Sequence, residues 1–346
     1  MKLLVCAAGL AALLIAPVRS QVANPAVEAA MEEIVVAGEY PGPGLWRVVK
    51  AAPDGEHVLW IFGTPRFVPE AIRWKSREVE RVAAASQELI MPESFGIKVD
   101  GKVGVFTMIR YLPAALRARK NPDDGKLQDV LPADVYARWK VLKARFIGRD
   151  NGIESWRPFF VAEKLTDEAF KDLRAEMGID PWRFIGPVAS EHKLRVTGPQ
   201  VEYKVPKEQL RDALKTFLKA PLADVECLDA TMKVLQGLAD HDATNARAMA
   251  WAKGNLAVLR GLPQLPDPDP PCTAALVESQ AILDLHLFEG KDQLQELGLQ
   301  KWLQAVEAAL THNRSTLALL PIEELLRPEG RLSTLRAKGY EVLDPT

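Results

Sequence analysis

Histidines are the residues of this sequence best suited to bind a metal. They stand far apart along the chain and have no spacing typical of metal ligands; they are His57, His192, His241, His286 and His312. The sequence also has no complete Gly-x-x-x-x-Gly-Lys-Ser/Thr phosphate loop, no Gly-x-Ser-x-Gly elbow and no His-Glu-x-x-His zinc motif. We therefore expect each histidine to be a surface residue or a hydrogen-bonded core residue. Spacing alone predicts no catalytic centre.

The first twenty residues carry a different kind of signal. Lys2 precedes an apolar run, Leu3–Pro17, and the short segment Val18–Ser20 suits a signal peptidase. The run is too short to span a membrane, so residues 1–20 are interpreted as a signal peptide. Cleavage after Ser20 gives a mature chain that begins at Gln21. No later segment has about 18 uninterrupted apolar residues, so we expect a soluble periplasmic or secreted protein without a membrane span.

Cysteine usage agrees with export. Cys6 leaves with the signal peptide, and Cys227 and Cys272 remain. Neither shows a neighbouring histidine or helix-start signal of a nucleophile. An even pair in an oxidising compartment is expected to form a disulfide, and two buried free thiols are the alternative.

The charge balance limits the class of partner. The chain has 44 basic and 46 acidic residues and no long run of one sign. A nucleic-acid partner would require a basic face, so none is expected.

The elements that must position any site begin after a Pro- and Gly-rich lead-in, residues 21–44. Apolar and polar residues alternate in Leu45–Lys50, as in a strand, and Pro53–Gly55 has the residue types of a turn. His57–Phe62 is expected to be a second strand that ends at Gly63. Together they predict a β-hairpin. A helix over 75–86 and a short buried strand over 88–91 follow. In the helix, Val79, Val82 and Ala83 share one face.

The middle of the chain, about residues 107–312, is expected to be mainly helical. Pro132 begins a helix whose apolar stripe is Val135, Trp139, Leu142 and Phe146. Further helices are predicted at 156–165, 208–218, 274–287 and 292–310, and a pair of helices at 228–253. A strand is predicted at 201–205 and a stiff Pro-rich connector at 266–271. The chain then returns to mixed structure, with strands at 316–320 and 340–343 and a helix at 332–338. The predicted fold class is mixed α/β, a sheet layered with helices over residues 45–346.

Several segments, taken in order, resemble the TraB/GumN (TraB/PrgY/GumN) family, which includes the Tiki proteases. They are Leu45–Val48, Val58–Thr64, Trp74–Arg81, Glu88–Met91, Leu131–Arg138, Ile153–Pro158, Trp251–Leu256 and Pro328–Tyr340. The resemblance covers most of residues 40–346. It implies a metal-dependent hydrolase site with two Gly-x-x-His motifs, a glutamate after the second conserved strand, and an Arg-Asn pair on a late helix.

The sequence departs from the family's pattern at both Gly-x-x-His motifs. The first retains Gly63 and Thr64 but carries Arg66 at the histidine position. The second has Pro321 in place of glycine and Glu324 in place of histidine. Arginine has no acceptor for a metal and is always charged, so Arg66 cannot act as a ligand.

The remaining site positions differ as well. Pro92 occupies the glutamate position, although Glu93 is adjacent, and Gly298 and Leu299 replace the Arg-Asn pair. These changes predict a degenerate site that holds no metal and no other cofactor. Because the two motifs meet at one site in the family, Arg66 is expected to form a salt bridge with Glu324 or Glu93. In the alternative, the side chains of Arg66 and Glu324 are each exposed to solvent and do not pair.

The sequence therefore favours a non-catalytic protein that binds a protein or small ligand, or supports the cell envelope. One alternative is a metal-dependent, peptidase-like hydrolase in which Glu93, Glu324 and a histidine regroup. An unrelated binding protein is a third reading.

Overall fold

The computed structural model places a mixed α/β fold within Glu39–Thr346. It describes residues 40–65, 68, 69, 72, 74, 76–100, 112, 113, 116–177, 181–206, 208, 209, 212, 223–238, 241–263, 272, 283 and 291–345. The predicted signal peptide, the cleavage point at Gln21, most of the lead-in, most of the helix at 208–218, the connector at 266–271 and nearly all of the helix at 274–287 lie outside the described residues.

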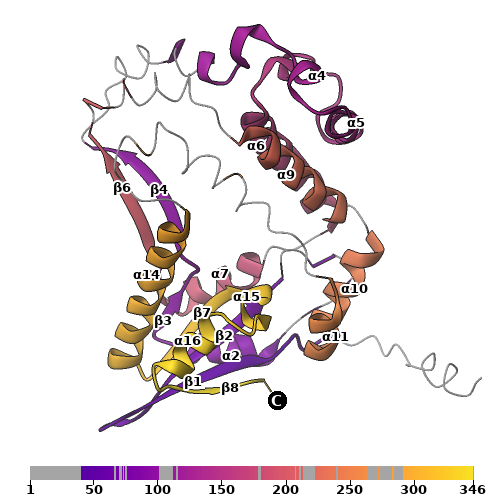
Figure 1. Ribbon diagram of the computed structural model, residues 1–346. Coiled ribbons are helices and arrows are strands. Elements are labelled where there is room, and N and C mark those ends of the chain that lie inside the picture. Colours follow the sequence, from indigo (N-terminus) through magenta and orange to yellow (C-terminus); the bar gives the residue numbers. More distant parts are fainter. Residues whose placement is uncertain are drawn as a thin grey trace, which may run out of the picture. The chain divides into compact units, whose positions relative to one another are not determined.

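Among the described residues, the larger of two sheets has six strands in the order β5-β3-β7-β2-β1-β8. Figure 1 labels these strands except β5. Their bounds are β1 Leu45–Ala52, β2 Gly55–Thr64, β3 Glu88–Ile90, β5 Arg195–Thr197, β7 Ser315–Pro321 and β8 Glu341–Leu343. β1 runs antiparallel to β2 and β8. The other neighbouring strands, β2 with β7, β7 with β3 and β3 with β5, pair in parallel. The predicted hairpin is confirmed as β1–β2.

The buried strands have the composition that a parallel sheet demands. Leu317, Ala318 and Leu320 of β7 are fully buried, because the helices α2 (Arg77–Ala85), α14 (Lys291–His312) and α15 (Ile322–Leu326) pack against this strand. A strand covered on both faces has no polar alternation. This is why the sequence shows a continuous apolar run at this position.

Helices cover the sheet and share its core. α2 (Arg77–Ala85) is capped by Ser76, whose hydroxyl accepts from the Val79 backbone at 3.2 Å, and it packs on α7 (Pro181–Glu191). α14 (Lys291–His312) packs across β1, β2, β3 and β7. The same core also includes residues of α10 (His241–Ala252), α11 (Leu256–Gly261), α15 (Ile322–Leu326) and α16 (Arg331–Ala337). The predicted sheet layered with helices is therefore confirmed.

The middle of the chain forms a second hydrophobic core. It contains α4 (Leu127–Val130), α5 (Ala133–Leu142), α6 (Pro158–Met177) and α9 (Asp224–Leu238). The predicted stripe of α5 is buried at three positions, and its fourth, Phe146, is half-buried in a π-helical turn. The helix predicted from residue 156 begins at Pro158 instead, since proline suits the first helical position.

The predicted disulfide joins Cys227 of α9 to Cys272, with their Cα atoms 4.5 Å apart. Cys227 is fully buried in the second core. The disulfide closes a loop whose ends are separated by 45 residues.

Two described strands form a small separate sheet. β4 (Ser94–Val99) pairs in parallel with β6 (Gln200–Val205). β6 matches the predicted strand at 201–205, whereas β4 was not expected. Among the described residues, no helix is long and apolar enough to cross a membrane.

Candidate functional site

The ends of β2 and β7 lie side by side. In the parallel register of these strands, Gly63 is opposite Leu320 and Thr64 is opposite Pro321. The Thr64 hydroxyl donates to the Leu320 carbonyl at 3.2 Å. The carboxyl ends of parallel strands therefore bring together segments more than 250 residues apart.

Gly63 is a packing position at this edge. A Cβ atom at residue 63 would lie 2.5 Å from Ile322 Cδ1 and 3.0 Å from Leu325 Cδ1. The Gly63 carbonyl accepts a hydrogen bond from Trp251 Nε1 at 2.8 Å. Glycine thus allows α15 to pack closely on β2 while α10 is anchored to the same residue.

Glu324 lies in the short helix α15, which begins directly after β7. Its position in the first turn is favourable for a carboxylate, because the helix dipole is positive there. Its Oε1 accepts from Arg327 Nη1 at 3.2 Å and its Oε2 from Arg331 Nε at 2.9 Å. Glu324 is therefore already paired with two guanidinium groups.

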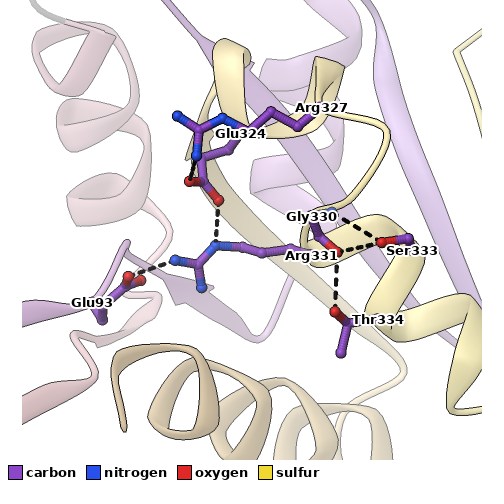
Figure 2. Close-up of polar contacts among 7 residues, drawn as sticks. All are labelled: Glu93, Glu324, Arg327, Gly330, Arg331, Ser333 and Thr334. Carbon is purple, nitrogen blue, oxygen red and sulfur yellow. Dashed lines mark hydrogen bonds and ion pairs between the residues drawn. The ribbon is translucent and has the colours of Figure 1, made fainter. Parts of the chain in front are cut away.

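Arg331 also joins Glu324 to Glu93, as Figure 2 shows. Its Nη2 lies 2.5 Å from Glu93 Oε1. Only 10% of the Arg331 side chain and 14% of the Glu93 side chain are exposed. The Arg331 guanidinium also lies over the ring of the buried Trp302, 4.9 Å from the ring centroid. The cation is thus held on one side by carboxylates and on another by an aromatic face.

Local structure fixes the start of the helix that carries Arg331. Arg331 is the first residue of α16 and follows the N-cap Gly330. The Ser333 hydroxyl accepts from the Gly330 backbone N–H at 2.9 Å, and Thr334 donates to the Gly330 carbonyl at 3.0 Å (Figure 2). These contacts hold the backbone from which Arg331 reaches between Glu93 and Glu324.

Gly298 of α14 provides room for Glu93. A Cβ atom at residue 298 would lie 3.2 Å from Glu93 Cγ and 2.8 Å from Phe95 Cζ. The position at which the family resemblance implies arginine therefore faces this same site. A long side chain at residue 298 would displace Glu93 from its contact with Arg331.

The structure brings together two of the predicted site residues, Glu93 and Glu324, through a residue that the sequence did not single out. Arg66 lies outside the described residues, so its predicted salt bridge stays a prediction. Arg331 carried one signal in the sequence. It is a cation directly after Gly330 at the start of a predicted helix, where the helix dipole disfavours positive charge.

The resemblance implies a metal at this site, but the described side chains do not fit one. Two carboxylates already face two guanidinium groups, so the cluster of Glu93, Glu324, Arg327 and Arg331 is neutral. Arg331 has no acceptor and cannot lose its proton. A divalent cation near its guanidinium would be repelled. Within the described part of the chain, no three His, Cys, Asp or Glu side chains group as metal ligands.

His57 matches the expectation of a hydrogen-bonded core histidine. It is 5% exposed, and its two ring nitrogens lie 3.0 Å from the Leu310 carbonyl and 3.0 Å from Asp54 Oδ1.

Comparison with known proteins gives one result. The model of the TraB/PrgY/gumN family matches residues 44–343, a range that contains Glu93, Glu324 and Arg331. No curated protein and no solved structure matches the chain significantly. The match runs from the start of β1 to the end of β8 and confirms the resemblance seen in the sequence. The chain belongs to the TraB/PrgY/gumN family.

Proposed function

We propose that this protein is a non-catalytic member of its family, in which a guanidinium group stands in place of a metal ion. The observation that supports this proposal is the Arg331 side chain, bonded at once to Glu93 and Glu324. Arg331, together with Arg327, balances the charge of both carboxylates. The site then serves to hold α16 to the segment between β3 and β4.

A protein without catalytic activity would act by binding a partner or by supporting the cell envelope. A fixed ion pair supplies neither an activated water molecule nor a Lewis acid, the two contributions of a catalytic metal. The partner would be a protein or a small ligand, because the near-neutral charge balance offers no general basic surface for nucleic acid.

Assays of peptide and ester hydrolysis test the absence of catalysis. Wild-type protein and the Glu324→Gln variant are compared with Mn²⁺, Co²⁺ or Zn²⁺ added and with EDTA. We expect no metal-stimulated turnover from either protein. Metal-stimulated turnover that is lost in Glu324→Gln would instead establish a hydrolase with rearranged ligands.

We further propose that the chain is exported and cleaved near Ser20. The Cys227–Cys272 disulfide supports this, because structural disulfides persist mainly in oxidising compartments. Intact-mass measurement of protein from an envelope fraction should give a chain that begins near Gln21. A mature protein that still carries Met1 would contradict export by cleavage.

A further inference from the structure

A separate pocket lies between α10, α11 and α15. It has a volume of about 300 Å³ and is lined by Arg247, Leu259, Arg260, Glu323, Leu326 and Pro328. This volume is at the lower end of the range for small-molecule sites. The lining combines two guanidinium groups, one carboxylate and an apolar wall.

Arg247 is the most unusual group in the pocket, because it is 7% exposed and yet pairs with no carboxylate of the described residues. Its Nη2 donates to the Pro263 carbonyl at 2.9 Å, and no carboxylate among the described residues lies within ion-pair distance. A buried guanidinium without an anion is energetically costly. Arg260, on the exposed side of α11, likewise has no carboxylate partner in the described part of the chain.

Glu323 adds a negative group to the same lining. It is half-buried in the first turn of α15, and no cation of the described residues pairs with it. Its neighbour Glu324 is instead bonded to Arg327 and Arg331. The pocket therefore presents charges of both signs, without ion-pair partners in the described part of the chain, around Leu259, which is 2% exposed.

The walls of the pocket are anchored to the sheet through one residue. Trp251 of α10 donates to the Gly63 carbonyl, and Ile322 of α15 packs against Gly63. A pocket whose walls are already fixed loses little entropy when a ligand binds.

We propose that this pocket binds a small zwitterion of the amino-acid type. Its carboxylate meets Arg247 and Arg260, its ammonium group meets Glu323, and its apolar side chain packs on Leu259 and Leu326. Guanidinium groups are well matched to a carboxylate. The inference does not depend on the absence of a metal from the Glu93–Glu324 site.

Isothermal titration in EDTA tests this proposal with a matched set of probes. L-Phenylalanine is compared with phenylalaninamide, which lacks the anion, and with N-acetylphenylalanine, which lacks the cation. The proteins are the wild type, Arg260→Gln, Glu323→Gln and the control Arg149→Gln, which removes an exposed arginine that does not line the pocket. Arg247→Gln is measured as well. Because this variant also loses the hydrogen bond to the Pro263 carbonyl, its effect on binding is compared with that of Arg260→Gln.

We expect the wild type to bind phenylalanine and to bind both capped analogues at least about tenfold more weakly, as loss of a charge-assisted contact implies. Arg260→Gln and Glu323→Gln should weaken phenylalanine binding by a similar factor, and Arg149→Gln should not. Three results would overturn the proposal: no binding of phenylalanine up to about 10 mM, equal binding of the capped analogues, or equal binding by the pocket variants. Because EDTA is present, these results leave the proposed loss of catalysis untouched.

Discussion

Arg331 and Glu93, 238 residues apart in the sequence, meet in an ion pair of 2.5 Å. The same guanidinium bonds to Glu324 at 2.9 Å. The contact joins the start of α16 to the segment after β3, and this geometry assigns a stabilising role to Arg331.

Replacing Arg331 should therefore destabilise the fold. Arg331→Met removes the charge and leaves the largely buried Glu93 with no ion-pair partner among the described residues, at a cost on the order of 2–3 kcal/mol. Arg331→Lys should lose less, because it keeps the charge but not the fork that reaches two carboxylates. Chemical denaturation monitored by circular dichroism measures the free energy of unfolding.

The matched control lies on the same helix. Arg336 pairs with Asp344 at 3.1 Å, and about half of each side chain is exposed. Arg336→Met should cost no more than about 0.5 kcal/mol. Equal losses from Arg331→Met and Arg336→Met would contradict a special role for Arg331.

Gly63 should be required for packing. Gly63→Ala places a methyl group against Ile322 Cδ1, at a cost of about 1–3 kcal/mol. Ile322→Val removes that Cδ1 atom, so the double variant should be more stable than the sum of the two single effects predicts. A double-mutant cycle by denaturation measures this coupling, and strict additivity would show that the two residues do not compete for space.

Glu88 should make the fold sensitive to acid. Burial alone would raise the pKa of this carboxyl group, but hydrogen bonds from Arg195, Thr197 and Asn313 hold it below its ordinary value of 4.5. Because the folded pKa is lowered, its contribution to stability is present above about pH 4.5 and is lost as the pH falls through the folded pKa.

Glu88→Gln should therefore cost on the order of 2 kcal/mol at pH 7 and less at low pH. Denaturation at neutral pH and near pH 3 provides the comparison. Glu56→Gln, which removes an exposed carboxylate paired with Arg47, is the control and should have a small effect at both pH values. A Glu88→Gln effect that does not change with pH would argue against this account.

Reduction of Cys227–Cys272 should loosen the helical middle more than the sheet. The chain-entropy model gives about 4 kcal/mol for a loop of this length. Hydrogen exchange should show a loss of protection in α6 and α9 on reduction, with β2 and β7 much less affected. Unchanged protection in α9 would contradict the assigned role of the disulfide.

The sequence predicted those parts of the fold that local chemistry determines. The β1–β2 hairpin follows from alternation around Pro53–Gly55, and α2 follows from the spacing of its buried residues. β4 was missed because its residues follow Pro92 and include Gly96, and its partner β6 lies more than 100 residues away. α7 was missed because it contains Pro187, a residue that disfavours a helix interior.

The site could be predicted only in part for the same reason. Glu324 was singled out because it stands at a histidine position of the family's pattern, and Glu93 because it adjoins the glutamate position, which is Pro92. Arg331 was not, because its role depends on a tertiary contact with Glu93. A side chain that bridges distant segments leaves no periodic signal in its own neighbourhood.

The most direct test of the central claim is a titration of Mn²⁺ and Zn²⁺ into EDTA-stripped wild-type protein, followed by calorimetry. If the Arg331 guanidinium takes the place of a metal between Glu93 and Glu324, no stoichiometric binding should be seen. Binding of one metal ion per chain, weakened by both Glu93→Gln and Glu324→Gln, would contradict the account.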